Sequence, residues 1–464
     1  MADSNSDEPA NGHADKKSGK DSSKLTTGRA RRAMKVGSLT TQVGGNYLLN
    51  ALKRPFQSGE ERADSILDTH LKNALLIVER SKELRGTFLK LMQMLSMRND
   101  ILPDEVLDVL SVVQSDVPPM DFAMIRERIE TELGDKIENL FASLDETAFA
   151  AASLGQVHRG TLRDGSEIVV KVQYPGVEKT VAQDLKNLKA LLHTFTLIGR
   201  DLFKQPIDAD ALHHEMEERL AEELDYELEA RNTDLFAEMF ADDEEILIPF
   251  VYHDLSSGRV LTLEYIEGYK LADILKPEID QELKDWVALK FHAVLWRQLL
   301  EFGTIHTDPH PGNYLITFHP CLGMLDFGSI RVFGEEIRQG YVRLARAILD
   351  KDYDGKVRAL IDLGYLAEED DPGSTIDVLD LIFEPATLDR EYDPREYGSL
   401  DRAWKSAQIR IESGFFRSPP PHSVFLSRAL IGLDSYMQML GTKANYHRLF
   451  AAAVAAAEAR CPAP

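Results

Sequence analysis

The spacing of apolar residues divides the chain into segments of different character. Residues 1 to about 25 carry almost no large apolar side chains, so they cannot bury enough surface to order themselves, and we expect a disordered tail. Between about 60 and 140, apolar residues recur at the spacing of an α-helix, as from Leu71 to Val78. We predict that this segment is helical.

Runs of β-prone residues follow near the middle of the chain. Residues 157–160 and 167–172 flank Asp164-Gly165, a dipeptide that favours a tight turn, so the pattern predicts a β-hairpin. Residues 260–265 form a further β-prone run. We therefore expect a small sheet built from at least these strands.

The rest of the chain is mainly helical in pattern. Helical periodicity runs from about 177 to 239 and returns after 271, where a strand-rich patch near 305–327 interrupts it. Strands followed by helices predict an α+β fold with a small mixed lobe and a larger, mostly helical lobe. The predicted boundaries are 1–59 for a tail and basic arm, 60–145 for a helical N-terminal extension, 146–268 for the smaller lobe and 269–464 for the larger lobe.

Charge narrows the possible partners. The chain has 464 residues and a formal net charge of −24 at pH 7. Nonspecific nucleic-acid binding requires a basic surface that displaces counterions, so we expect no nucleic-acid partner. Residues 22–59 differ from the rest, because they contain seven Lys and Arg residues and no Asp or Glu. This arm could dock on anionic lipid or on the acidic body of the same protein, or it could be a solvated basic linker.

Two further features bear on location. The sequence has only two cysteines, Cys321 and Cys461, which predicts no disulfide framework and favours a reducing compartment. We find no apolar stretch long enough for a transmembrane helix and no secretory signal pattern at the N-terminus. We expect a cytoplasmic protein that can lie at the inner face of a membrane.

The strongest chemical signal lies in the larger lobe. Asp308 and Asn313 are five residues apart, as the catalytic Asp and Asn are in the loop of protein kinases. Asp326-Phe327-Gly328 follows thirteen residues after Asn313, a gap that fits a short hairpin bringing both metal ligands together. The pattern predicts a site for ATP and Mg²⁺, with Asn313 and Asp326 on the metal and Asp308 as the base that orients an acceptor.

The smaller lobe supplies candidates for the rest of the nucleotide. Lys171, at the end of Val169-Val170-Lys171, is placed where a strand lysine would contact the α- and β-phosphates. Residues 263–268 resemble the hinge between kinase lobes, so Glu264 and Ile266 are candidates for contact with adenine. Taken alone, Lys171 would more commonly be a surface lysine on a strand.

A transition-metal site is an alternative for one segment. His306, Asp308 and His310 alternate and could place ligands on one side of a strand. Pro309 and Pro311 would break that strand, so the kinase-like interpretation is favoured.

With these motifs the chain resembles a known family, the UbiB-like, AarF-domain atypical kinases associated with ubiquinone biosynthesis. The resemblance extends from about residue 80 to 335 and more loosely to the end. It implies a two-lobed, protein-kinase-like fold with a helical N-terminal extension. Three segments resemble motifs of the family. Ala150-Ala151-Ala152-Ser153 matches the alanine-rich loop that replaces the kinase glycine-rich loop. Residues from Lys171 to Val177 match the segment after that loop, and Glu223-Leu224-Asp225 resembles the family's Glu-x-Asp motif.

The resemblance implies roles for several residues. Glu229 is found where the family places the partner of the strand lysine, here Lys171. Lys90 and Gln93 match a motif that reaches into the active site and occludes the substrate region, although Met92 stands where the family has glycine. Glu223 and Asp225 belong to the same regulatory set, and Glu223 would contact metal or hold the extension.

Three functions follow from these observations. The leading hypothesis is an Mg²⁺-ATP-dependent atypical kinase or ATPase that supports ubiquinone or other isoprenoid-lipid metabolism. A second is an ATP-switched lipid-binding module without phosphotransfer, and a third is a small-molecule kinase of the aminoglycoside or choline type. The motifs predict ATP as a partner, and the basic arm favours anionic membrane lipid. The resemblance implies an isoprenoid or quinone-precursor lipid and quinone-biosynthesis enzymes as further partners.

Overall fold

The computed structural model describes residues 119–151, 154–198, 208–308, 310–397, 402–403 and 420–460, with scattered helical residues between 34 and 94. The chain divides into two compact units. Unit 1 consists of 1–128, 150–156 and 174–213, and unit 2 consists of 129–149, 157–173 and 214–464. Most of the predicted basic arm, residues 22–59, lies outside the described residues. No helix among the described residues is both long and apolar enough to cross a membrane.

The main element of unit 1 is helix α7 (Val177–Ile198). Leu185, Leu188 and Leu192 recur at helical spacing and are buried, which explains why this stretch is helical. Unit 1 also contains strand β2 (Ala150–Ala151) and the first residues of helices α5 (Phe122–Leu133) and α8 (Ala209–Glu223).

A sheet in unit 2 contains the predicted hairpin. Four of its strands lie in the order β1 (Ser143–Leu144), β3 (Gly155–Thr161), β4 (Glu167–Gln173) and β6 (Val260–Glu264). The turn between β3 and β4 is at Asp164-Gly165, as the sequence predicts. Gly165 has a φ of +91°, which a residue without Cβ adopts readily, and Asp164 Oδ1 accepts a hydrogen bond from the Ser166 N–H at 2.9 Å.

Helix α9 (Tyr226–Met239) covers one face of this sheet. Ile168, Val170 and Val172 of β4 are fully buried and point to the opposite face, because side chains alternate along a strand. A separate apolar cluster forms between α9 and the sheet. It consists of Tyr226, Ala230, Val251, Leu261, Leu263 and the partly buried Val169. Lys171 therefore shares its face with Val169 and lies under α9.

Two small sheets form the strand-rich patch that the sequence predicts near 305–327. One has the order β5 (Ile246–Leu247), β10 (Leu322–Met324), β9 (Tyr314–Ile316) and β7 (Tyr269–Lys270), and the other pairs β8 (Thr304–His306) with β11 (Ile330–Val332). Strands β9 and β10 are antiparallel, with Tyr314 opposite Met324. The connection between residues 313 and 326 is thus the short hairpin expected from the sequence.

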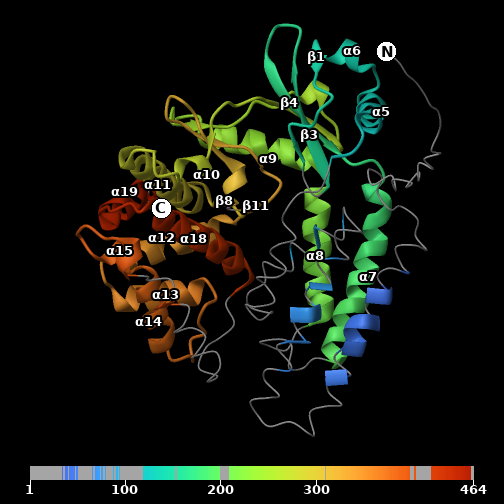
Figure 1. Ribbon diagram of the computed structural model, residues 1–464. Coiled ribbons are helices and arrows are strands. Elements are labelled where there is room, and N and C mark those ends of the chain that lie inside the picture. Colours follow the sequence, from blue (N-terminus) through green and yellow to red (C-terminus); the bar gives the residue numbers. More distant parts are fainter. Residues whose placement is uncertain are drawn as a thin grey trace, which may run out of the picture. The chain divides into compact units, whose positions relative to one another are not determined.

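Helices make up most of the remainder of unit 2 (Figure 1). The longer ones are α11 (Gln281–Trp296), α12 (Glu335–Leu349), α13 (Tyr353–Asp362), α14 (Gly373–Ile382), α18 (Pro421–Leu440) and α19 (Tyr446–Arg460). The shorter ones are α6 (Ile137–Leu140), α10 (Leu271–Ile274), α15 (Glu384–Thr387), α16 (Pro394–Tyr397) and the 3₁₀ turns η3 (His253–Leu255) and η5 (Pro311–Asn313). A π-helix, η4 (Arg297–Phe302), continues α11 and ends at Gly303, whose φ is +61°.

Candidate active site

An ion-pair network joins three distant parts of unit 2. Lys171 on β4 donates hydrogen bonds from Nζ to both carboxylate oxygens of Glu229 on α9, at 2.7 and 2.8 Å. The same Nζ lies 3.3 Å from Oδ2 of Asp326. The side chain of Glu229 is 3% exposed, whereas that of Asp326 is 42% exposed. The lysine is held firmly by a buried partner and loosely by an accessible one.

Burial and charge act in opposite directions on this network. Burial lowers the pKa of Lys171, but the carboxylates of Asp326 and Glu229 outweigh it and raise that pKa well above its ordinary value. Burial raises the pKa of Glu229 to about 7, although the charge of Lys171 opposes the shift. Lys171 therefore keeps its proton at neutral pH and supplies a fixed positive charge beside Asp326.

The loop after β8 holds Asp308 and Asn313 together. Asn313 Nδ2 donates to Asp308 Oδ2 at 3.1 Å and to the Asp308 backbone oxygen at 3.3 Å. The amide oxygen of Asn313 is then directed elsewhere, and none of the described donors bonds to it. The Leu325 N–H donates to the Asn313 carbonyl oxygen at 2.9 Å, so this loop is fixed to the residue that precedes Asp326.

The backbone and side chain of Asp326 are both restrained. His306 Nε2–H donates to the Asp326 carbonyl oxygen, and the Asp308 N–H donates to His306 Nδ1 at 3.3 Å. Because Nδ1 accepts, the single ring proton must be on Nε2. The Gly328 N–H donates to Asp326 Oδ1 at 3.0 Å. One carboxylate oxygen of Asp326 is thus oriented by Gly328 and the other by Lys171.

Both histidines of the transition-metal alternative have other roles. His306 is buried and bonded as above, and His310 Nδ1 accepts a hydrogen bond from the Gly312 N–H at 3.0 Å, which caps the turn η5. Among the described residues, no group of three or more His, Cys, Asp or Glu side chains is arranged to hold a metal ion. These contacts disfavour the alternative.

The donor set at Asn313 and Asp326 fits magnesium rather than a softer metal. Mg²⁺ prefers oxygen ligands and is commonly held by one or two protein groups together with substrate phosphates. Asp326 offers a partly exposed carboxylate, and Asn313 offers an amide oxygen that no described donor uses. The two residues that the sequence singles out as metal ligands are therefore compatible with that role.

The predicted hinge residues, Glu264 and Ile266, lie at the end of strand β6 and just after it. Glu264 is the last residue of β6; its N–H donates to the Phe250 carbonyl oxygen at 2.9 Å, and its Oε2 accepts from the Phe250 N–H at 3.2 Å. Ile266 is buried and lies beside Gly323 of β10. Their predicted contact with adenine stays a prediction.

The two acidic residues of the Glu-x-Asp motif differ in position. Asp225 is the N-cap of α9, where its Oδ1 accepts a hydrogen bond from the Leu228 N–H at 2.9 Å. Glu223 is the half-buried last residue of α8, next to Glu222, which forms an ion pair with Arg331 at 2.9 Å. Asp225 thus has a structural task that the sequence did not reveal, and the occluding role of both residues stays a prediction.

Several predicted residues belong to unit 1 or lie outside the described residues. Ala150 and Ala151 form the exposed strand β2, and Lys90 is helical and half-buried. Ala152, Ser153, Met92 and Gln93 lie outside the described residues. The nucleotide-binding and occluding roles of this set remain predictions.

Sequence reasoning missed three supporting residues. The Tyr226 ring lies under Lys171, with Nζ 5.1 Å from the ring centroid. Asn232 Nδ2 donates to the Phe327 carbonyl oxygen at 2.9 Å, and Gln298 Oε1 accepts from the His306 N–H at 2.8 Å. Tyr226 and Asn232 stand three residues before and after Glu229, so helical spacing from Glu229 could have identified both.

These residues are arranged as a protein-kinase-like site would require, and comparison with known proteins identifies the class of protein. A family model, the ABC1 atypical kinase-like domain, matches residues 112–360. A chloroplastic protein of Arabidopsis thaliana, ACTIVITY OF BC1 COMPLEX KINASE 1, is 36% identical over 66% of this chain and 46% of its own length. The mitochondrial atypical kinase COQ8B of Rattus norvegicus is 30% identical over 88% of this chain and 77% of its own length. The chain spans about half the length of the chloroplastic relatives.

A solved structure shows the same fold. The structure of Rv3197 from Mycobacterium tuberculosis in complex with erythromycin has a TM-score of 0.57 and 24% sequence identity, and it covers 84% of this chain and 97% of its own. This chain belongs to the ABC1 atypical kinase-like family. That membership confirms the resemblance and the kinase-like α+β fold, and it favours the UbiB-type hypothesis over a small-molecule kinase.

Proposed function

We propose that this chain binds Mg²⁺-ATP and acts as an atypical kinase or ATPase of the UbiB type. The observation that carries the proposal is the network of Lys171, Glu229 and Asp326, which places a buried, paired lysine beside an accessible carboxylate. Kinases use this combination to position a triphosphate and its metal. The resemblance to the UbiB-like family, which is associated with ubiquinone biosynthesis, extends the proposal to ubiquinone or other isoprenoid-lipid metabolism.

Each residue would have a distinct task. Lys171 would hold the α- and β-phosphates, and Glu229 would orient it through the two short hydrogen bonds. Asn313 and Asp326 would hold Mg²⁺, which when bound neutralises phosphate charge. Asp308, oriented by Asn313 Nδ2, would accept the proton of an acceptor hydroxyl or of water.

The contacts of Lys171 suggest how nucleotide would enter the network. A lysine ammonium has three donors, and Glu229 engages Nζ at 2.7 and 2.8 Å. The remaining contact, to Asp326, is longer at 3.3 Å and more exposed. Phosphate oxygens could replace that contact without disturbing Glu229, which would release Asp326 for the metal.

Removing the charge of Asp326 tests the proposal. The Asp326→Asn variant keeps the size of the side chain but weakens the metal site, so we expect loss of Mg²⁺-dependent ATP turnover by at least two orders of magnitude. A phosphate-release assay at saturating Mg²⁺ measures this loss. Asp354→Asn, which changes an exposed residue on α13, is the matched control and should retain turnover. Turnover by a folded Asp326→Asn protein at the unmodified level would refute the assignment.

The basic arm supports a second candidate, an ATP-switched module that binds lipid without transferring phosphate. Residues 22–59 carry seven cationic side chains and no acidic ones, which suits contact with an anionic membrane. In this proposal the protein lies at a membrane surface and presents an isoprenoid or quinone-precursor lipid to biosynthetic enzymes. The two candidates differ in the role of ATP, which is the substrate of catalysis in the first and a switch for lipid binding in the second.

A further inference from the structure

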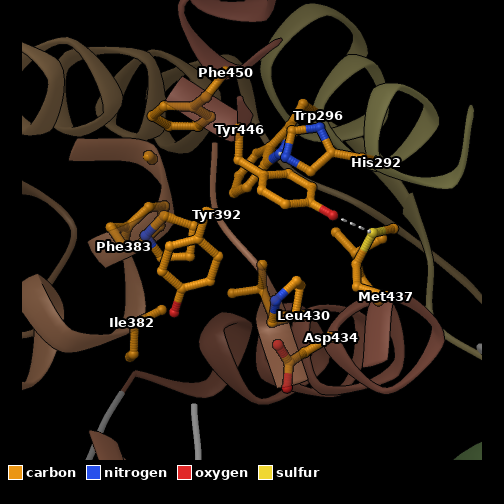
Figure 2. A pocket seen from close by; sticks show the side chains of 14 residues that line it. His292, Trp296, Ile382, Phe383, Tyr392, Leu430, Asp434, Met437, Tyr446 and Phe450 are labelled. Carbon is orange, nitrogen blue, oxygen red and sulfur yellow. Dashed lines mark hydrogen bonds between the residues drawn. The ribbon is translucent and has the colours of Figure 1, made fainter. Parts of the chain in front are cut away.

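A pocket in unit 2 is lined by none of the residues assigned to the proposed nucleotide site. It is bounded by α11, α18 and α19 and by the segment from α14 to α16, and the residues that define it include His292, Trp296, Tyr392 and Asp434 (Figure 2). Its cavity volume is about 80 Å³. This is about half the volume of an apolar cavity of roughly 150 Å³ that holds a benzene molecule, so the pocket would enclose a single ring only in part and leave the rest at the mouth.

The walls of the pocket are mostly aromatic. The rings of Trp296 and Phe450 have centroids 4.7 Å apart, and Phe383 lies 5.8 Å from Phe450. The rings of Tyr392 and Tyr446 pack edge to face, with centroids 6.3 Å apart and an interplanar angle of 85°. These rings support one another, so the walls are rigid and offer flat faces and edges to another aromatic ring.

One buried polar group is available to a ligand. The Trp296 indole N–H donates to His292 Nε2 at 3.0 Å, so the imidazole proton must be on Nδ1. His292 is 7% exposed, and no described residue accepts a hydrogen bond from its Nδ1–H. Burial lowers the pKa of His292 to about 4, so the ring is neutral at neutral pH. His292 thus lines the pocket as a neutral ring whose Nδ1–H has no acceptor among the described residues.

The other polar groups of the pocket have partners. Tyr446 donates from its hydroxyl to the Thr442 carbonyl oxygen at 3.0 Å, with Met437 Sδ at 3.4 Å, a contact drawn in Figure 2. Asp434 accepts a hydrogen bond from Gln438 Nε2 at 2.6 Å. Among the described residues that line the pocket, Asp434 is the one charged side chain, and none is Lys or Arg. The carboxylate of Asp434 would repel an anionic ligand.

We propose that this pocket binds a neutral, single-ring aromatic compound with a hydrogen-bond-accepting oxygen, such as an aryl ketone. The rings of the walls contact the ligand ring, and His292 Nδ1–H donates to its oxygen. The inference goes beyond the proposed function and uses none of the residues assigned to ATP or magnesium. A mere packing gap would not discriminate between ligands of equal size.

Three probes of similar size test the ligand class on the full chain. Acetophenone carries the acceptor oxygen, α-methylstyrene replaces that oxygen with a CH₂ group, and benzoate carries a negative charge. We expect acetophenone to bind about tenfold more tightly than α-methylstyrene, because one buried hydrogen bond is lost. Benzoate should bind more weakly than either. Ligand-observed NMR titration gives the three dissociation constants. Absence of acetophenone binding, or benzoate binding of equal strength, overturns the proposal.

A pair of substitutions on α18 tests the location. Leu430 lines the pocket, whereas its neighbour Ile431 is 46% exposed and is not one of the lining residues. Leu430→Phe should fill the cavity and weaken acetophenone binding at least tenfold, whereas Ile431→Phe should leave it unchanged. Thermal unfolding checks that both variants fold. If a folded Leu430→Phe protein binds acetophenone as the unmodified chain does, the ligand lies elsewhere and the proposal fails. If Leu430→Phe does not fold, Ala386→Val, at another lining position, replaces it with the same expected direction.

Discussion

At the scale of single residues, Glu229 is the most unusual group in the site. It is a carboxylate with almost no exposed surface, and burial raises its pKa to about 7 even though Lys171 is bonded to it. A buried carboxylate is tolerated when it is paired, but removing either partner leaves the other charge without compensation. We therefore expect the charge state of Glu229 to depend on Lys171 and on pH.

The pH dependence of stability follows from that pKa. Between pH 4.5 and about 7 the folded protein holds a proton on Glu229 that the unfolded chain releases, so the free energy of unfolding falls as pH rises through this window. We expect Glu229→Gln, which cannot titrate, to remove this contribution. Urea unfolding at pH 5 and pH 7.5 without nucleotide measures the difference. Glu238→Gln, an exposed residue on the same helix, should keep the slope of the unmodified protein. An identical slope in Glu229→Gln would show that another group is responsible.

At the scale of elements, the sequence predicted some secondary-structure features and not others. Asp164-Gly165 specifies a turn through local backbone preferences, so the β3–β4 hairpin was predictable. Strands β5 and β10 pair in parallel over only two residues each. These residues are far apart in sequence, so no local sequence pattern predicts the pairing. The π-helix η4 also escaped prediction, because apolar spacing cannot distinguish one wide turn from an α-helix.

The same distinction holds within the candidate site. Asn313 and Asp326 flank the β9–β10 hairpin and Asp308 lies just before it, so their offsets alone indicated a shared site. Lys171 and Glu229 are 58 residues apart, and only the family resemblance suggested their pairing. The cap at Asp225 was missed, since an acidic residue before a helix can cap it or serve a site equally well.

Helix α9 carries Glu229 one turn after its cap, so its start should matter to the site. Asp225→Ala removes the acceptor for the Leu228 N–H, and we expect a loss of about 1 kcal/mol in the free energy of unfolding. Asp225→Asn keeps an acceptor and should retain most of that stability. Urea unfolding and ATP turnover, measured on both variants, separate a cap from the predicted regulatory role. If Asp225→Asn is as stable as the unmodified chain but has altered turnover, the charge acts on the site.

At the scale of the whole molecule, charge is strongly segregated. A chain with a net charge of −24 contains a segment, 22–59, whose charged residues are all basic. Each cation close to an anionic membrane contributes roughly 1 kcal/mol to binding, so a few of them decide whether the protein is found on the membrane.

Replacing Arg29, Arg31 and Arg32 by Gln in the full chain tests this idea. We expect binding to phosphatidylglycerol or cardiolipin vesicles to fall by roughly two orders of magnitude, as measured by co-sedimentation. Lys136, Arg358 and Arg448 are 71%, 73% and 75% exposed, and their joint replacement by Gln makes the same change in net charge elsewhere. That control should bind like the unmodified protein. Equal binding by both triple variants would exclude the arm as the lipid contact.

The burial of Phe327 has a consequence for the design of inhibitors. Its side chain has no exposed surface, its ring centroid lies 4.8 Å from that of Phe236, and its carbonyl oxygen is held by Asn232. A drug-like compound that works by expelling the phenylalanine of an Asp-Phe-Gly segment would first have to offset about 2–3 kcal/mol of lost burial here. Compounds that occupy the space beside Lys171 and leave Phe327 in place would avoid that penalty. A medicinal-chemistry series directed at this protein should favour the second type.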